Sequence, residues 1–171
     1  MKRIATPLER AGLSPPGQPA PGWRTTEWLN SPRPIDLASL RGRVVVLHAF
    51  QMLCPACVSH GLPQAQRIHE LFPPSEVATI GLHTVFEHHE AMTPTALRAF
   101  VHEYRFSFPI GIDAPSGDPA DPAPATMRAY AMRGTPSLIL IDRNGFLRRH
   151  GFGAEDDLAV GAAIATLAAD S

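Results

Sequence analysis

Apolar residues occur along this chain in short blocks with two kinds of spacing. RVVVLHAF (43–50) and SEVATIGLHTVF (75–86) contain apolar, β-branched runs without the alternation of a half-exposed strand. Such runs are typical of strands buried on both faces of a parallel or mixed sheet. FPIGI (108–112) is a shorter run of the same kind. These blocks predict three sheet strands in the middle of the chain.

Between and after the strands, the spacing becomes helical. PACVSHGLPQAQRIHELF (55–72) places Pro55 at a first helical position and Pro63 inside the helix, where a kink is expected. TPTALRAFVHEYRF (93–106) begins with Thr93 as a candidate N-cap before a proline. ATMRAYAM (125–132) and DDLAVGAAIATLAA (156–169) complete the predicted helices.

Two stretches carry hairpin signals. SLILID and FLRRHGF are joined through DRNG, a strong two-strand turn signal at 142–145. Near the N-terminus, GWRTTEWLN and PIDLASL flank the turn-like SPRP at 31–34. We expect the second pair to form a short hairpin or flap laid against the main sheet.

The order of these elements predicts an α/β fold, a mixed sheet with helices on both faces and an N-terminal hairpin extension. Residues 1–22 include the Pro-rich stretch GLSPPGQPAPG, an extended lead-in. Residues 23–171 form the predicted domain. A chain of 171 residues is long enough to bury a sizeable core without disulfides or metals.

Composition narrows the functional classes. With 44% hydrophobic residues and a formal net charge of -1, the chain gives no electrostatic reason to expect a nucleic-acid or membrane partner. Pro7, Glu9 and Arg10 interrupt any apolar core of a signal peptide, and no bilayer-length apolar run follows. We therefore expect a cytoplasmic protein, in which a permanent disulfide is disfavoured.

The chain has two cysteines, Cys54 and Cys57, which stand three positions apart at the start of the predicted helix. Helix N-terminal amides and the helix dipole favour the thiolate of Cys54, which makes it a nucleophile. Cys57 follows within the first turn and can resolve a mixed disulfide. A zinc site would need further ligands such as His83, His88 or His89, so redox chemistry is the favoured interpretation over a metal site or an inert pair.

Several motifs together resemble the thioredoxin superfamily. LRGRVVVLHAF before C-P-x-C, EYRFSFPIGID, and RGTPSLILIDRNG are similar to the redoxin branch, the TlpA-like thiol-disulfide oxidoreductases grouped with the AhpC/TSA proteins. The resemblance covers about residues 23–169. It implies a thioredoxin-like fold, a cis-Pro136 beside the cysteines, and a Thr135 backbone that binds a substrate peptide.

The resemblance also implies an activity. We expect a thiol-disulfide oxidoreductase without a cofactor that acts on a protein or small-molecule disulfide and receives electrons from a thiol donor. Three positions depart from the family pattern. Leu53 replaces a tryptophan before the first cysteine and predicts a different client surface, while His48 and His60 stand where relatives carry acids.

An imidazole can take the proton of the resolving thiol, so His48 and His60 are candidate proton-transfer groups. The alternative is a hydrogen-bonded core histidine at 48 and a solvated one at 60. Pro63 falls nine residues after Cys54, one later than is usual in the family. If the helix absorbs this extra residue, the His60 ring is rotated away from the sulfur.

Two other functional classes remain open. A peroxiredoxin-like peroxidase would carry threonine where this chain has Gln51, although Arg133 could serve as its arginine. A non-enzymatic binding or redox-sensor module would use the cysteine pair differently. Phe86, with Trp23 and Trp28, either frames a client groove or caps a small core.

Overall fold

A six-stranded mixed sheet forms the centre of the molecule in the computed structural model, which describes residues 6–170. Its strands lie in the order β1-β4-β3-β2-β5-β6. β2 runs parallel to β3, and β3 parallel to β4, while β1, β5 and β6 pair antiparallel to their neighbours. The strands are β1 (Thr25–Leu29), β2 (Val44–Phe50), β3 (Val77–His83), β4 (Ile110–Asp113), β5 (Ser137–Ile141) and β6 (Leu147–Phe152).

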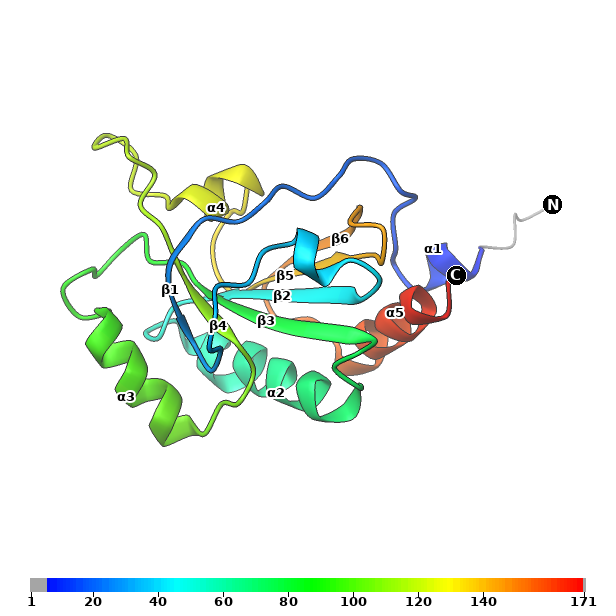
Figure 1. Ribbon diagram of the computed structural model, residues 1–171, viewed down its shortest axis with the longest axis horizontal. Helices are drawn as coiled ribbons and strands as arrows, with labels where there is room; N and C mark the ends of the chain where they lie inside the picture. Colours follow the sequence, from blue (N-terminus) through cyan, green and yellow to red (C-terminus); the bar gives the residue numbers. More distant parts are fainter. Residues whose placement is uncertain (1–5, 171) are drawn as a thin grey trace.

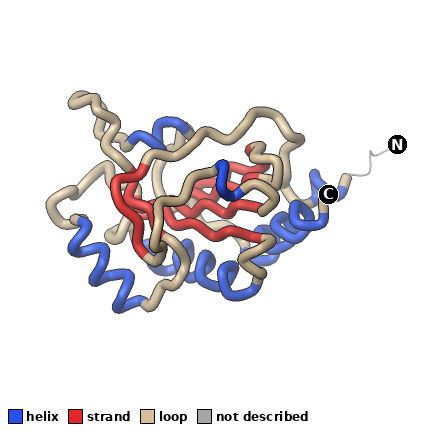
Figure 2. Tube along the Cα trace, in the orientation of Figure 1, coloured by secondary structure: helices blue, strands red, loops and turns tan. Residues whose placement is uncertain are grey.

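Helices cover both faces of this sheet, as predicted (Figure 1). α2, α3 and α5 lie together on one face, and the short α4 lies on the other (Figure 2). A 3-10 turn and a π-helical turn complete the elements. The helical segments are α1 (Pro7–Arg10), the 3-10 turn Ala38–Leu40, the π-helical turn Cys57–Gly61, α2 (Leu62–Leu71), α3 (Pro94–Tyr104), α4 (Ala125–Ala129) and α5 (Asp157–Ala169).

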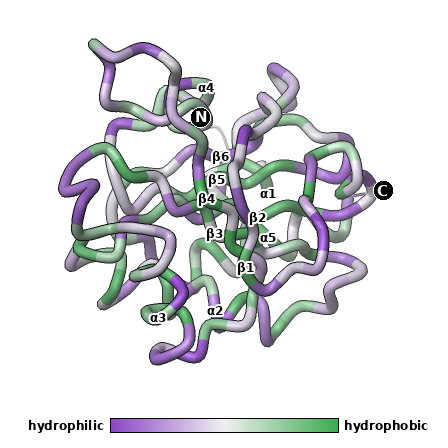
Figure 3. Tube along the Cα trace, turned by 60° about the vertical axis from the view of Figure 1, so that its left-hand side comes forward, coloured by the Kyte–Doolittle hydropathy of each residue, from purple (hydrophilic) through white to green (hydrophobic). Residues whose placement is uncertain are grey.

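The central strands are buried on both faces, which explains their unbroken apolar pattern. All seven residues of β2 and all seven of β3 are buried. Val45 and Leu47 belong to the core beneath α4, whereas Val44 and Val46 pack in the core beneath α5. Figure 3 shows this hydrophobic sheet surrounded by more polar loops.

Of the two forms predicted for residues 23–40, the structure contains the flap against the sheet and not the local hairpin. Residues 25–29 do form a strand, but β1 pairs with β4 at the sheet edge, where Trp28 lies opposite Gly111. Residues 34–40 instead cross the face and form the 3-10 turn, held where Trp23 Nε1 donates to the Ile35 carbonyl oxygen at 2.6 Å. β1 therefore pairs with the edge of β4 and not with the segment that follows it in the chain.

Residues 11–20 of the Pro-rich lead-in run beside β6. The Ser14 amide donates to the Arg148 carbonyl oxygen at 2.8 Å, and the Leu147 amide donates to the Gln18 carbonyl oxygen at 3.1 Å. The buried Arg148 side chain bonds Ser14 and pairs with Asp142 at 3.1 Å. This segment therefore covers one edge of the sheet through backbone and side-chain bonds.

Candidate redox site

Cys54 and Cys57 lie where β2 ends and the helix begins, and their sulfur atoms form a disulfide with a Cα to Cα distance of 5.2 Å. The Cys57 amide donates to Cys54 Sγ at 3.3 Å, which is the N-cap contact expected of a residue that precedes a helix. Cys57 is fully buried, whereas Cys54 is partly exposed. A partner molecule can therefore reach Cys54 but not Cys57.

The Thr135-Pro136 peptide bond is cis, as the resemblance implied. β5 runs antiparallel to β2, so the first residues of β5 lie beside the last residues of β2. Cys54 Sγ lies 3.5 Å from the Thr135 carbonyl oxygen, and a thiol at this position would donate to that oxygen. The structure thus brings Cys54, Thr135 and Pro136 together, as predicted.

The helix absorbs the extra residue before Pro63 as a π-helical turn. The Leu62 amide donates to the Cys57 carbonyl oxygen, five residues back instead of four. Pro63 follows directly and has no amide hydrogen, so it cannot continue the regular α-helical ladder there. The irregularity that we expected as a kink is therefore this wider turn, and it contains both Cys57 and His60.

The π-helical turn directs His60 toward the loop before α5. His60 Nε2 lies 2.6 Å from the Glu155 carbonyl oxygen. A carbonyl oxygen only accepts, so Nε2 carries the hydrogen and Nδ1 is the basic nitrogen of the neutral ring. The bond to residue 155 therefore fixes the ring orientation and the tautomer, and it leaves the lone pair on Nδ1.

His48 lies on β2 beneath the start of the helix and is 2% exposed. Burial lowers its pKa from 6.5 to about 4, an effect that the nearby His60 adds to and the Gln64 side chain opposes. A β-carbon added to Gly61 would lie 3.7 Å from His48 Nδ1 and 3.3 Å from Pro136 Cβ. His48 therefore contacts the helix segment that carries Cys57, on the side of cis-Pro136.

Gln64 is a site residue that sequence reasoning missed. It is 2% exposed, and its Nε2 donates to the Glu155 carbonyl oxygen at 2.9 Å and to Asp157 Oδ1 at 2.7 Å. The available signal was a polar residue between Leu62 and Ala65 on the inward face of the helix. Gln64 and His60 therefore bind the same carbonyl group.

The two predicted client-binding side chains have different positions. Leu53 is 57% exposed beside Cys54, so it is available to a client. Phe86 is partly buried and packs, with Trp23 and Trp28, against the core beneath α4. Cys54 and Cys57 pack in the core on the opposite face. The aromatic cluster thus packs against a core, while the Phe86 amide bonds Gln51 in the segment that leads to Cys54.

The residues considered for a peroxidase have structural partners. Gln51 is 1% exposed, its Oε1 accepts from the Phe86 amide at 3.2 Å, and its Nε2 donates to Glu87 Oε1 at 3.2 Å. Arg133 is exposed and lies over the Phe152 ring, 5.0 Å from its centroid. Gln51 therefore fixes the loop after β3, and Arg133 packs on the surface.

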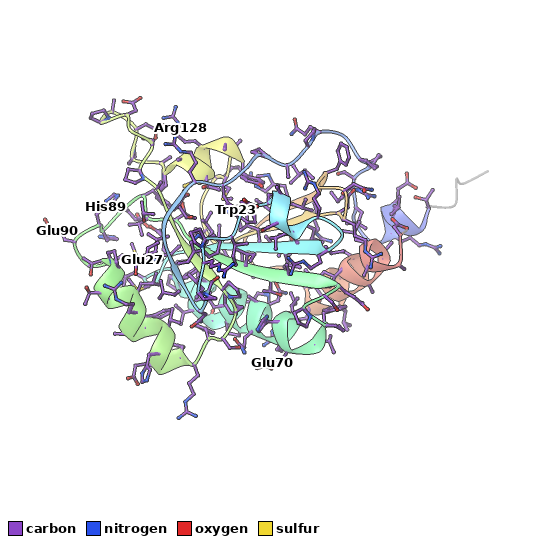
Figure 4. All side chains as sticks on the ribbon, viewed as in Figure 1. Trp23, Glu27, Glu70, His89, Glu90 and Arg128 are labelled. Atoms are coloured by element: carbon purple, nitrogen blue, oxygen red, sulfur yellow. A yellow bond between two sulfur atoms is a disulfide. The ribbon has the colours of Figure 1, made fainter. Side chains whose placement is uncertain are left out.

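Three histidines were considered for a metal site: His83 at the end of β3, and His88 and His89 in the loop after it. His83 is 1% exposed beside Phe50, and burial lowers its pKa from 6.5 to about 4. His88 and His89 are exposed, and Figure 4 shows His89 and Glu90 on the outer side of the loop before α3. Within residues 6–170, no group of three His, Cys, Asp or Glu side chains is arranged to hold a metal ion.

None of the helices in the described part of the chain is long and apolar enough to cross a membrane. This agrees with the absence of a bilayer-length apolar run in the sequence.

Comparison with known proteins identifies the family. The AhpC/TSA family model matches residues 16–150. A thioredoxin-like superfamily protein of known structure is 55% identical, with a TM-score of 0.87 over 91% of this chain and 99% of that one. A thiol-disulfide isomerase from Corynebacterium glutamicum is 45% identical, with a TM-score of 0.83 over 89% of this chain and 98% of that one.

Protein DipZ of Mycobacterium bovis and of Mycobacterium tuberculosis is 31% identical over 154 residues, or 89% of this chain. The chain spans 20% of the length of these curated relatives. The structural matches confirm the thioredoxin-like fold, and the sequence matches agree with them. The chain belongs to the AhpC/TSA family and is a thioredoxin-superfamily protein of the redoxin, TlpA-like type.

Proposed function

We propose that the protein is a thiol-disulfide oxidoreductase in which Cys54 is the nucleophile and Cys57 the resolving cysteine. The observation that carries the proposal is the asymmetry of the pair: Cys54 is partly exposed at a helix N-cap, and the bonded Cys57 is fully buried. In the reducing direction, the Cys54 thiolate attacks a client disulfide, forms a mixed disulfide and releases one client thiolate.

The second step closes the cycle. The Cys57 thiol loses its proton, and its sulfur attacks Cys54 Sγ. The Cys54-Cys57 bond forms as the Cys54-client bond breaks, and the second client sulfur leaves with the electron pair. The client is reduced by two electrons, the cysteine pair is oxidised, and a thiol donor reduces the pair again. The oxidising direction uses the same steps in reverse.

We assign the proton of Cys57 to His48. Burial keeps the His48 ring neutral near pH 7, so one ring nitrogen keeps a lone pair for a proton donor. His48 lies beside Gly61 in the turn that carries Cys57, whereas the His60 ring is directed toward the Glu155 carbonyl group in the loop before α5. His60 is the second candidate, and an unchanged exchange rate in His60→Ala would remove it from the mechanism.

The client surface consists of Leu53, Thr135 and Pro136 around Cys54. Leu53 supplies an exposed apolar contact, and the Thr135 backbone borders the reactive sulfur. We expect a protein or small-molecule disulfide as the client. The Corynebacterium glutamicum relative is a thiol-disulfide isomerase, which supports this expectation. A cytoplasmic location remains a prediction from the sequence.

Insulin reduction by the purified protein with a dithiol donor tests this function. We expect turnover in the wild-type protein and none in Cys54→Ser, because the attacking sulfur is lost. A zinc analysis and a peroxide-consumption assay on the same samples address the alternatives. Bound zinc without turnover would indicate a metal clip, and rapid peroxide consumption without insulin reduction would indicate a peroxidase.

A further inference from the structure

Two buried polar atoms beneath the redox site have no hydrogen-bond partner within the described residues. They are His48 Nε2 and Gln64 Oε1. An unpaired buried polar atom costs free energy, so such atoms call for a structural explanation. The Gln64 side chain interacts with His48 and raises the pKa of its ring, against the larger effect of burial. The simplest pairing of this donor and this acceptor is with each other.

The orientation of both side chains supports that pairing. Gln64 Nε2 is fixed by its bonds to Glu155 and Asp157, which directs Oε1 away from that loop. On the other side, His48 Nδ1 is the ring nitrogen nearest to Gly61, within the turn that carries Cys57. The two nitrogens of His48 therefore have different neighbours. Nδ1 lies near Gly61 in the π-helical turn, and Nε2 is available to bond Gln64.

Resting on the function proposed above, we propose that Gln64 is a positioning residue for His48. Its Oε1 accepts the Nε2 hydrogen, which fixes the ring tautomer with a lone pair on Nδ1, toward the helix start. The proton of the Cys57 thiol passes to Nδ1, and the Cys57 thiolate then attacks the mixed disulfide. The His48 imidazolium keeps its Nε2 hydrogen bond to Gln64 and later returns the proton to solvent or to the departing client thiolate.

Charged and titratable groups surround this pair from the π-helical turn, α2, β6, the loop before α5 and the start of α5. His60 approaches from the π-helical turn and disfavours the protonated form of His48. Gln64 is also linked to an ion pair on the helix surface, because Asp157 binds both Gln64 and Arg67. Glu155, whose carbonyl group binds Gln64, forms an ion pair with Arg149 of β6. A variant at residue 64 must therefore be compared with one that leaves these pairs intact.

The test uses ring nitrogen chemical shifts of the full-length protein, which report the tautomer of each histidine. At pH 7 we expect His48 of the wild type to carry its hydrogen on Nε2. In Gln64→Leu we expect the hydrogen to move to Nδ1 in a large fraction of molecules, and the resolving step to slow about tenfold, the loss expected for one hydrogen bond to a charged group.

Gln64→Glu separates positioning from anchoring. Both variants lose the Nε2 bonds to Glu155 and Asp157, but glutamate keeps an acceptor for His48. We expect Gln64→Glu to retain the Nε2 hydrogen and to raise the His48 pKa, opposite to Gln64→Leu. If Gln64 only anchored the loop, the two variants would behave alike. Gln64→Glu also preserves the side-chain volume, so it remains informative if Gln64→Leu does not fold.

Gln66→Leu is the matched control on the same helix, because Gln66 lies outside the site and bonds Glu70 and Ser107. It should leave the His48 tautomer unchanged. A wild-type tautomer in Gln64→Leu, alongside normal insulin turnover by the wild type, would overturn the positioning role alone. A wild type without insulin turnover would remove the proposed function, and the catalytic use of His48 with it, whatever the tautomer.

Discussion

Leu53 is the exposed residue next to the reactive sulfur. Thioredoxin relatives place tryptophan there, so leucine leaves a smaller apolar contact for the client. Leu53 is 57% exposed, and its side chain contributes little to the core. We therefore expect Leu53 to act in client recognition and to contribute little to stability.

Leu53→Ser tests this assignment. We expect kcat/KM for insulin reduction to fall about three- to tenfold, because an apolar contact of this size contributes about 1 kcal/mol. The urea midpoint should remain within error of the wild type. Leu71→Ser is the control, since Leu71 is 74% exposed at the far end of α2. An equal loss of activity in both variants would contradict a specific role for Leu53.

Burial of His83 predicts one contribution to the pH dependence of stability. Its folded-state pKa of about 4 lies below the ordinary 6.5, because burial disfavours the charged ring. Between these values the unfolded chain binds a proton that the folded protein does not. The free energy of unfolding therefore falls as the pH falls from 6.5 toward 4, and the stabilising contribution is full above 6.5. His48 acts in the same sense.

We expect the free energy of unfolding to fall by about 2 kcal/mol for each of these histidines when the pH is lowered from 7 to 5. Burial raises the pKa of Asp113, which works in the opposite sense, but this effect is common to all variants. Urea unfolding of His83→Leu at both pH values should show a pH dependence about 2 kcal/mol smaller than in the wild type. His102→Leu, at an exposed position, should match the wild type. Equal pH dependence in all three proteins would argue against a neutral, buried His83.

At the level of residues, the sequence predicted the cysteine pair and the Thr-Pro motif, but it did not predict the side chains that contact them. Cys54, Cys57, Thr135 and Pro136 were predicted because their types and order along the chain are specific to one superfamily. Gln64 could not be predicted, because its role depends on Glu155, a distant loop residue, and on His48 beneath it. For Phe86 the sequence left a client groove and a core cap open, and the side chain packs against the core beneath α4.

The elements of the site show how one residue of spacing changes a side chain's direction. The position of Pro63 predicted an irregular helix, and the structure contains a π-helical turn at Cys57–Gly61. Spacing alone could not say where the turn would direct His60, because the Glu155 carbonyl group that receives it lies after β6. The N-cap of α3, a local contact from Thr93 to the Ala96 amide, was predicted correctly.

The local pattern did not predict that β1 pairs with β4. The packing of β1 against β4 gives a test of this pairing. A β-carbon on Gly111 of β4 would lie 2.8 Å from the Thr25 side chain and 3.2 Å from the Trp28 ring. We expect Gly111→Ala to lower the free energy of unfolding by about 1–3 kcal/mol through overpacking, and to change tryptophan fluorescence.

Gly161→Ala in α5 is the control for this substitution. Nothing lies within 4 Å of a β-carbon there, so alanine should be neutral or stabilise the helix by up to about 1 kcal/mol. Equal stabilities for the two variants would contradict the pairing of β1 with β4.

For the whole molecule, the order of buried runs and helices was enough to predict the layered sheet, because each buried strand must be covered on both faces. The edges were harder to predict. β4 is covered by β1, and residues 11–20 bond to β6 through Ser14, Gln18 and Arg148. These contacts are between segments more than 80 residues apart, so no local pattern contains them.

The fold leaves Cys54 partly exposed and buries Cys57. Trapping a mixed disulfide therefore tests the proposed roles of the two cysteines most directly. Cys57→Ser, in the reduced state and incubated with insulin, should accumulate a covalent adduct on Cys54 that mass spectrometry detects and dithiothreitol releases. Cys54→Ser should form no such adduct, because Cys57 is fully buried. Adduct formation on Cys57 in Cys54→Ser, or none in Cys57→Ser, would contradict the assignment of nucleophile and resolving cysteine.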